Sequence, residues 1–430
     1  MKNFLSGNPL ARNAFWMVLG QALRLVIQTL YFIEIARSLG VRNYGAFISV
    51  VALVAIVYPF GSLGSGSLLI KSVARDKNLF SSYWGKALTT TAIFGSLLLL
   101  VVLVVSQLAL PPKIPHRLVA LVAVSDIIGL NIISIAAQAF QAFDRLIYTA
   151  AINVMISAGR LLGAFILIAI IPHPSALQWG YIYFGGTAVV ATTAWLLVSK
   201  ILGSPEFNWH RSRAELREGF YFSASQTTQT IYNDIDKTML ARLATLEATG
   251  VYGAAYRLID VIFVPVSALL ASAYPNFFRM GVDGISSSLT YAKPLLLRAM
   301  KYAGLMGLIV LLSANLVPYI LGAEYAATAE ALRWLAVLPV LKVAHRFLSD
   351  ALTGAGYQAL RTVIQAGVAI FNVVINLWLI PSYSWRGAAW ASIASDAALA
   401  CAIGAAALVL SRRSRMVFVG AMSDVSADLE

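Results

Sequence analysis

The chain has a single cysteine, Cys401, among its 430 residues, and only 12% of its residues are charged. One cysteine excludes an intrachain disulfide and any metal cluster held by cysteines. Soluble domains carry about 25% charged residues, so this composition excludes an ordinary soluble enzyme. No nucleophile and base stand together in a catalytic motif, and the four histidines show no metal-ligand spacing: His116, His173, His210 and His345. We therefore expect no catalytic residue, no metal site and no cofactor.

Long apolar runs are what the chain has instead. Hydrophobic residues make up 59% of it, with a mean hydropathy of +0.77. A membrane-spanning helix takes about 20 such residues, so we expect an all-α integral membrane protein with about 12 transmembrane helices. The first run shows no cleavage site and is interpreted as a retained span. The expected spans are residues 13–35, 44–70, 87–110, 119–143, 147–171, 177–198, 220–240, 251–274, 303–321, 329–353, 363–380 and 388–410.

The basic residues of the loops predict the orientation. The N-terminus and every second loop hold nineteen Lys and Arg, whereas the opposite loops hold six: Arg37, Arg42, Lys113, Arg117, Arg242 and Arg386. Because basic loops stay in the cytoplasm, both termini are expected there. The net charge of +13 then reflects topology, so no nucleic-acid partner is expected. The longest loops, residues 200–219 and 276–302, are both expected on the cytoplasmic side.

A weak internal repeat divides the chain in two. Arg37 and Arg242 follow the first span of each half and stand 205 residues apart, and Tyr44 and Tyr252 stand 208 apart. We expect two six-helix lobes, residues 1–199 and 220–410, joined by a cytoplasmic linker at 200–219 and followed by a tail at 411–430. Since both lobes enter the membrane from the same side, the repeat is parallel, which predicts a substrate cavity between the lobes and alternating access.

Charged residues inside spans are the main functional signal, because they are costly in lipid and generally face protein or water. Gln21, Arg24, Gln28 and Tyr31 lie on one face of the first span. Arg24, and Arg160 in the fifth span, have no acidic residue within one turn on their own helix. We expect both to line a hydrated cavity that receives an anionic group, because the guanidinium fork matches phosphate. Gln21 and Gln28, on the same face as Arg24, are expected to bind the substrate as well.

Each of the remaining charged residues within the spans has two possible interpretations. Lys237, Arg257 and Arg346 are candidate substrate ligands, but Arg257 with Asp260, and Arg346 with Asp350, are also spaced to pair along their own helices. Asp234 and Asp236 could bind a coupling proton or sodium ion, or simply neutralise Lys237. The glycine-rich stretch at 61–66 lies inside an apolar span, which favours close helix packing over a phosphate-binding loop.

Three stretches carry a resemblance to a known family. They are Ile35-Ala36-Arg37-Ser38-Leu39-Gly40 with Tyr44-Gly45, Gly61-Ser62-Leu63-Gly64 with Lys71 and Arg75, and Asp236-Lys237-Thr238-Met239-Leu240 with Gly250-Val251-Tyr252-Gly253. Their order and spacing resemble the polysaccharide-transport or Wzx-type oligosaccharide flippases of the multidrug/oligosaccharidyl-lipid/polysaccharide (MOP) superfamily.

The resemblance implies a transporter of the bacterial inner membrane. It would move an undecaprenyl-pyrophosphate-linked oligosaccharide to the periplasmic leaflet for O-antigen, capsule or exopolysaccharide assembly, with membrane lipids, a polysaccharide polymerase and other assembly proteins as partners. Arg24 matches the cationic cavity of such relatives by its position. Lipid II flippases of the superfamily typically have two more spans, which argues against a peptidoglycan precursor as substrate.

Two other functions remain open. A multidrug or cation antiporter of the same superfamily would need a cavity dominated by acidic and aromatic residues, whereas Arg24 and Arg160 are basic. A membrane glycosyltransferase or polymerase would show a substantial external loop with catalytic groups, and the external loops here are short.

Overall fold

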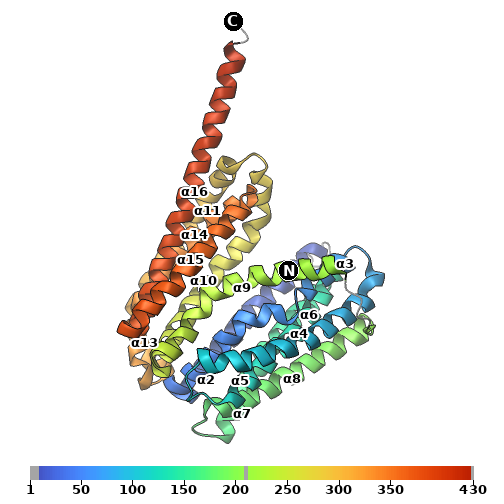
Figure 1. The fold of residues 1–430 in the computed structure, drawn as a ribbon, viewed down its shortest axis with the longest axis vertical. Coiled ribbons are helices and arrows are strands. Elements are labelled where there is room, and N and C mark those ends of the chain that lie inside the picture. Colours follow the sequence, from blue (N-terminus) through green and yellow to red (C-terminus); the bar gives the residue numbers. More distant parts are fainter. Residues whose placement is uncertain (1–8, 208–211, 428–430) are drawn as a thin grey trace. The chain divides into compact units, whose positions relative to one another are not determined.

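The computed structural model describes residues 9–207 and 212–427; the remaining linker residues, His210 among them, lie outside this part. Within it every regular element is a helix, so the expected all-α fold is confirmed (Figure 1). The elements are α2 (Pro9–Gly61), α3 (Ser65–Val73), η1 (Lys77–Leu79), α4 (Phe80–Ala109), α5 (His116–Ala123), η2 (Val124–Leu130), α6 (Asn131–Ala142), α7 (Leu146–Ile170), α8 (Ala176–Ile201), α9 (Arg213–Leu243), α10 (Leu246–Gly281), α11 (Ile285–Ser313), η3 (Ala314–Leu316), α12 (Val317–Leu321), η4 (Ala323–Tyr325), α13 (Ala326–Leu335), α14 (Leu338–Gly354), α15 (Gln358–Tyr383) and α16 (Trp385–Ala427).

The chain divides into two compact units. The first comprises Met1–Gly250 and Ile320–Glu324, and the second comprises Val251–Tyr319 and Tyr325–Glu430. Helix α9 therefore packs with the first unit, and the division falls inside α10 rather than in the linker at 200–219. The two six-helix lobes that the sequence repeat predicts, residues 1–199 and 220–410, stay a prediction.

Helix α2 is 53 residues long and contains a single non-helical residue, Gly40, at φ 71° and ψ 166°. A positive φ is easy only for glycine, which has no side chain to clash. The backbone N–H of Val41, just after the kink, donates to the Glu324 carboxylate at 3.1 Å. A kink interrupts the hydrogen bonds of the helix, and this carboxylate provides the N–H with an acceptor. The expected spans 13–35 and 44–70 thus begin as one kinked helix.

The glycine-rich stretch breaks the second of these spans, which is not the continuous helix that the sequence predicted. Helix α2 ends at Gly61, and Leu63 (φ 45°) and Gly64 (φ 63°) turn the chain into α3. A Cβ atom added at Gly66 would run into the Gln138 side chain, and one added at Gly61 would crowd Ile127. Close helix packing, the expected role of this stretch, is confirmed.

The fourth span combines α5, η2 and α6. Its middle section, Val124–Leu130, is a π-helix, a rare conformation that is frequent at functional sites. The wider turn is held at its end by Asn131, whose side-chain amide donates to the carbonyls of Ile127 at 2.9 Å and Tyr58 at 3.1 Å. The π-helix carries a buried carboxylate, Asp126, which is only 6% exposed.

Each unit has its own apolar core. In the first unit, buried residues such as Trp84, Phe140 and Ala194 join α4, α6 and α8. In the second, Phe277, Ala299 and Phe347 join α10, α11 and α14. These alanines let the helices approach closely, as is typical of helices packed in membranes.

Large apolar side chains also cover much of the outer surface, with Leu108 at 76% and Leu312 at 72% exposed. Such exposure suits contact with lipid, because water would make it unfavourable. Nine helices of the described residues are long and apolar enough to cross a membrane. One of these, Leu19–Val73, overlaps two expected spans, 13–35 and 44–70, while α9 and the pair α13–α14 match the expected spans at 220–240 and 329–353. The protein is therefore a multi-pass membrane protein.

The expected long loop at 276–302 is wrong. Helix α10 continues to Gly281 and α11 begins at Ile285, so only a short turn separates them. The Lys, Arg and Ser residues of this stretch indicated a loop, but Lys and Arg are good helix formers whose long side chains can reach water from a helix end. A glycine at φ 93°, Gly284, makes the turn.

Candidate functional site

A cavity of about 410 Å³ lies within the first unit, between α2, α6 and α7. Arg24 and Gln28 reach it from α2, and Arg160 reaches it from α7. The sequence had selected these three residues from different spans as substrate ligands, and the structure brings them to one space. The size is in the range of small-molecule sites, which run from about 300 to 1,000 Å³.

The lining of the cavity is partly polar and partly apolar, and it has no carboxylate among the residues that the structure describes. Besides the two arginines it presents amide and hydroxyl side chains, namely Gln28, Tyr58, Ser134, Gln138, Gln141, Thr149, Asn153 and Ser157. Guanidinium groups bind phosphate oxygens, and amides and hydroxyls can both donate to and accept from sugar hydroxyls. The cavity can therefore hold a phosphorylated sugar.

Arg160 has a carboxylate partner that the sequence did not reveal, because the partner lies on another helix. Its Nη2 atom donates to the Tyr183 hydroxyl at 2.5 Å and lies 3.6 Å from Oδ1 of Asp126. The Tyr183 hydroxyl in turn donates to the same Asp126 oxygen at 2.7 Å. The guanidinium also sits 4.6 Å from the centre of the Tyr183 ring. Arg160 thus belongs to the cavity and to a buried polar triad of Asp126, Tyr183 and Arg160.

A second, smaller cavity of about 80 Å³ shares Tyr58, Ser134 and Gln138 with the first. It extends the polar lining to Gln226 on α9. Gln21, by contrast, is exposed near the start of α2.

The acidic cluster on α9 contains an ion pair. Lys237 is buried and donates to Asp234 Oδ1 at 2.5 Å and to the Asn233 carbonyl at 3.0 Å. Asp236 is buried, and its Oδ1 accepts from the backbone N–H of Lys237 at 2.8 Å. Neutralisation of Lys237 by Asp234 was one of the two readings of this cluster. The role of Asp234 and Asp236 in ion coupling stays a prediction.

Arg257 and Arg346 lie in the second unit, where the acids expected beside them on their own helices pair with other cations. Lys342 Nζ lies 3.5 Å from Asp260 Oδ1, and it lies 4.4 Å from the centre of the Tyr256 ring. Asp350 pairs with Arg361 of the next helix at 3.4 Å. Asp260 and Asp350 thus have partners on neighbouring helices that spacing along one helix does not reveal, and the expected pairs within one helix stay a prediction.

Sequence reasoning missed most of the cavity lining. Gln138 and Gln141, and Asn153 and Ser157, are spaced by three and four residues, so each pair could have been recognised as one polar helix face. Tyr58 and Tyr183 gave no such signal, because aromatic residues within spans are usually part of the core.

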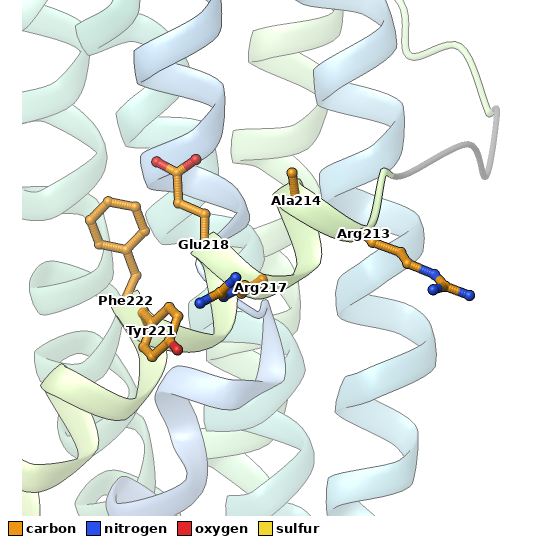
Figure 2. A pocket seen from close by; sticks show the side chains of 6 residues that line it. All are labelled: Arg213, Ala214, Arg217, Glu218, Tyr221 and Phe222. Atoms are coloured by element: carbon orange, nitrogen blue, oxygen red, sulfur yellow. The ribbon is translucent and has the colours of Figure 1, made fainter.

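A further hollow of about 730 Å³ lies on the first turns of α9, where Figure 2 shows its lining residues. Arg217 lies 5.7 Å from the Tyr221 ring centre, and Lys71 binds Glu218 at 2.6 Å. Tyr221 is 59% exposed, so the hollow is open to the surroundings. Aromatic and basic residues together are typical of the boundary between lipid and water.

The helices and the cavity define a multi-pass membrane protein with a polar, cationic site enclosed among its spans. The chain belongs to the family described as polysaccharide biosynthesis protein, whose family model matches residues 10–281. The expected resemblance to a family that acts in polysaccharide biosynthesis is confirmed.

Among curated proteins, the chain is similar to the probable low-salt glycan biosynthesis flippase Agl15 of Haloferax volcanii. The two are 23% identical over 404 residues, which cover 90% of this chain and 81% of the relative.

Two solved structures share the fold. One is an inward-facing multidrug resistance MATE family transporter of the MOP superfamily, at 15% identity and a TM-score of 0.68, covering 91% of this chain and 99% of that chain. The other is the lipid II flippase MurJ in an inward closed conformation, at 12% identity and a TM-score of 0.70, covering 95% and 92%.

Proposed function

We propose that this protein is a flippase that carries a polyprenyl-pyrophosphate-linked oligosaccharide across the membrane by alternating access. The observation that carries the proposal is the first-unit cavity, which combines Arg24 and Arg160 with amides and hydroxyls and has no carboxylate among its described lining. Membership of the polysaccharide biosynthesis family and the similarity to a glycan biosynthesis flippase support the same substrate class.

The chemistry of such a substrate explains the lining. Each sugar hydroxyl costs several kcal/mol to bring unpaired into hydrocarbon, and a pyrophosphate costs far more. Arg24 and Arg160 would bind the pyrophosphate while the amides of Gln28, Gln138 and Asn153 replace water around the first sugar. The polyprenyl tail needs no polar partner and can stay in lipid.

The biological setting is part of the proposal. The protein would act in the bacterial inner membrane, with both termini in the cytoplasm, and would deliver glycan for O-antigen, capsule or exopolysaccharide assembly. The split of nineteen basic loop residues against six supports the orientation. A reporter active only in the periplasm should be silent when fused to the C-terminus, and activity there would reject the orientation.

The function is tested by reconstituting the purified protein in proteoliposomes with a fluorescent polyprenyl-pyrophosphate oligosaccharide. Flipping exposes the label to an external quencher, so the quenched fraction rises above that of protein-free vesicles if the proposal is right. Arg386→Ala provides a matched control, because Arg386 pairs with Glu330 on an exposed surface. Wild-type vesicles that flip no more than empty ones, yet transport a cationic dye, would reject the proposal in favour of a multidrug antiporter.

A further inference from the structure

The buried triad of Asp126, Tyr183 and Arg160 connects the cavity to a carboxylate that does not line it. The Asp126 side chain is 8% exposed and that of Arg160 is 22% exposed, so the acid lies behind the base. Both hydrogen bonds of the Tyr183 hydroxyl are within the triad, one accepted from Arg160 and one donated to Asp126. The triad is thus a closed chain of polar contacts that ends at the cavity.

Arg160 retains donor capacity for a ligand. A guanidinium has five N–H donors, and the structure shows one of them, on Nη2, bonded to Tyr183. The Nε atom is buried without a hydrogen-bond partner among the described residues. An anion entering the cavity would find this cation already engaged by Asp126, and the two negative groups would compete for it.

Among the described residues, Arg160 is the cation that the structure shows against Asp126, at 3.6 Å. Arg24 of α2 lines the same cavity, and Lys200 lies in the last turn of α8. Tyr58 and Tyr31 of α2 interact electrostatically with the triad, and both are neutral. Helix α6 carries no charged residue, and Ile127 and Ile128 of the π-helix face Gly95 of α4. The titratable and charged residues of α4 and α5 are Tyr83, Lys86, His116 and Arg117, all near the starts of those helices. At 1.5 Å per residue, Lys86 and Arg117 are about 14 Å along their helices from this level.

We propose that Asp126 is a built-in competitor of the substrate: it holds Arg160 when the cavity is empty and helps to displace the pyrophosphate so that the headgroup is released. This inference rests on the proposed function and names the residue that sets the affinity of the cavity for the pyrophosphate headgroup. A carrier must bind strongly enough to load and weakly enough to unload, as conduction through a channel also requires. Two arginines in a partly enclosed cavity would hold a doubly negative pyrophosphate diester too long without such a competitor.

The proposal predicts a change in anion affinity whose direction is opposite to the one that loss of structure would produce. Removing the acid should strengthen binding of the anion, whereas a merely damaged site should bind it more weakly. The pH dependence has a sign as well. Acid neutralises Asp126, so wild-type affinity should rise as the pH falls, and a variant without the carboxylate should lack this rise.

The test is calorimetry on the full-length protein in lipid nanodiscs, with dimethyl pyrophosphate as the probe because this diester keeps both charges between about pH 5 and pH 8. Asp126→Asn should bind it roughly tenfold more tightly at neutral pH, and the affinity of Asp126→Asn should not change with pH. In proteoliposomes the same variant should show a lower KM and a lower kcat. Asp396→Asn, a buried aspartate of the second unit, is the matched control and should behave as wild type.

The outcomes separate the two claims. Wild-type binding with Asp126→Asn equal or weaker at every pH would overturn the competitor role and leave the flippase proposal standing. No binding of the probe to wild type would reject both. If Asp126→Asn does not fold, as judged by size-exclusion chromatography, Asp126→Leu is used with the same criteria.

Discussion

The two units of the chain use charged residues in different ways. In the second unit, cations pair with acids on neighbouring helices: Lys342 with Asp260 at 3.5 Å and Arg361 with Asp350 at 3.4 Å. The first unit also contains ion pairs, such as Lys237 with Asp234 at 2.5 Å, but there Arg24 and Arg160 line a cavity, and Asp126, close to Arg160, lies behind it. A charge within a span is therefore not a site by itself. The position of its partner decides whether it joins helices or is available to a ligand.

The largest expected effect is the loss of one half of a buried pair in the second unit. The Arg361 side chain is 15% exposed and that of Asp350 is 12% exposed, so Arg361→Leu removes the cation paired with a largely buried acid and should cost about 3–5 kcal/mol of unfolding free energy. Arg361→Leu combined with Asp350→Leu should recover most of that loss. Unfolding in detergent measures the free energies of the single and double variants. Equal losses in the two variants would show that the pair does not stabilise the second unit, which contradicts the comparison.

Next in size is the effect of Arg24 on transport. A hydrogen bond to a charged group contributes about 1.5–3 kcal/mol, so Arg24→Ala should reduce flipping by roughly 10- to 100-fold and abolish surface polysaccharide in cells. Arg24→Lys should retain part of the activity, since it keeps the charge but not the fork. The flipping assay measures this at matched protein amounts. Flipping by Arg24→Ala at the wild-type rate would remove Arg24 from the site.

A close contact between α2 and the start of α10 tests the helix packing of the first unit. A Cβ at Gly45 would meet the Leu246 carbonyl, and one at Gly250 would meet the Val41 carbonyl. Gly45→Val should therefore destabilise the protein by about 1–3 kcal/mol, as overpacking does. Gly304→Val is the control, because a Cβ there meets nothing within 4 Å. Equal stability of the two variants in thermal unfolding would contradict the contact.

The smallest expected effect concerns energy coupling by the acidic cluster. If Asp236 binds a coupling proton or sodium ion, Asp236→Asn should reduce stimulation by an imposed gradient a few-fold while transport without a gradient persists, because a bound ion acts only through its different affinity for two states. Asp234→Asn is compared alongside, since it loses the partner of Lys237. Unchanged gradient dependence in both variants would reject these residues as coupling sites.

The sequence predicted the helical fold and the first members of the cavity better than it predicted their partners. Apolar runs and the polar stripe with Arg24 and Gln28 depend on local periodicity, which one chain displays directly. The pairing of Arg160 with Asp126 joins residues 34 positions apart through a π-helix that has no sequence signal. The loop expected at 276–302 failed for a related reason, because polar composition alone does not separate a loop from the exposed end of a long helix.

The central claim, that the first unit contains a water-filled anion site, can be measured by cysteine labelling. The single native cysteine makes Cys401→Ser a cysteine-free background. In that background Asn153→Cys, on the cavity wall, should react with a negatively charged, water-soluble methanethiosulfonate, and dimethyl pyrophosphate should slow the reaction. Leu100→Cys, on an apolar surface that is 62% exposed, should react little and without protection. Labelling at Asn153→Cys that the diester does not slow, or no labelling there at all, would contradict the account.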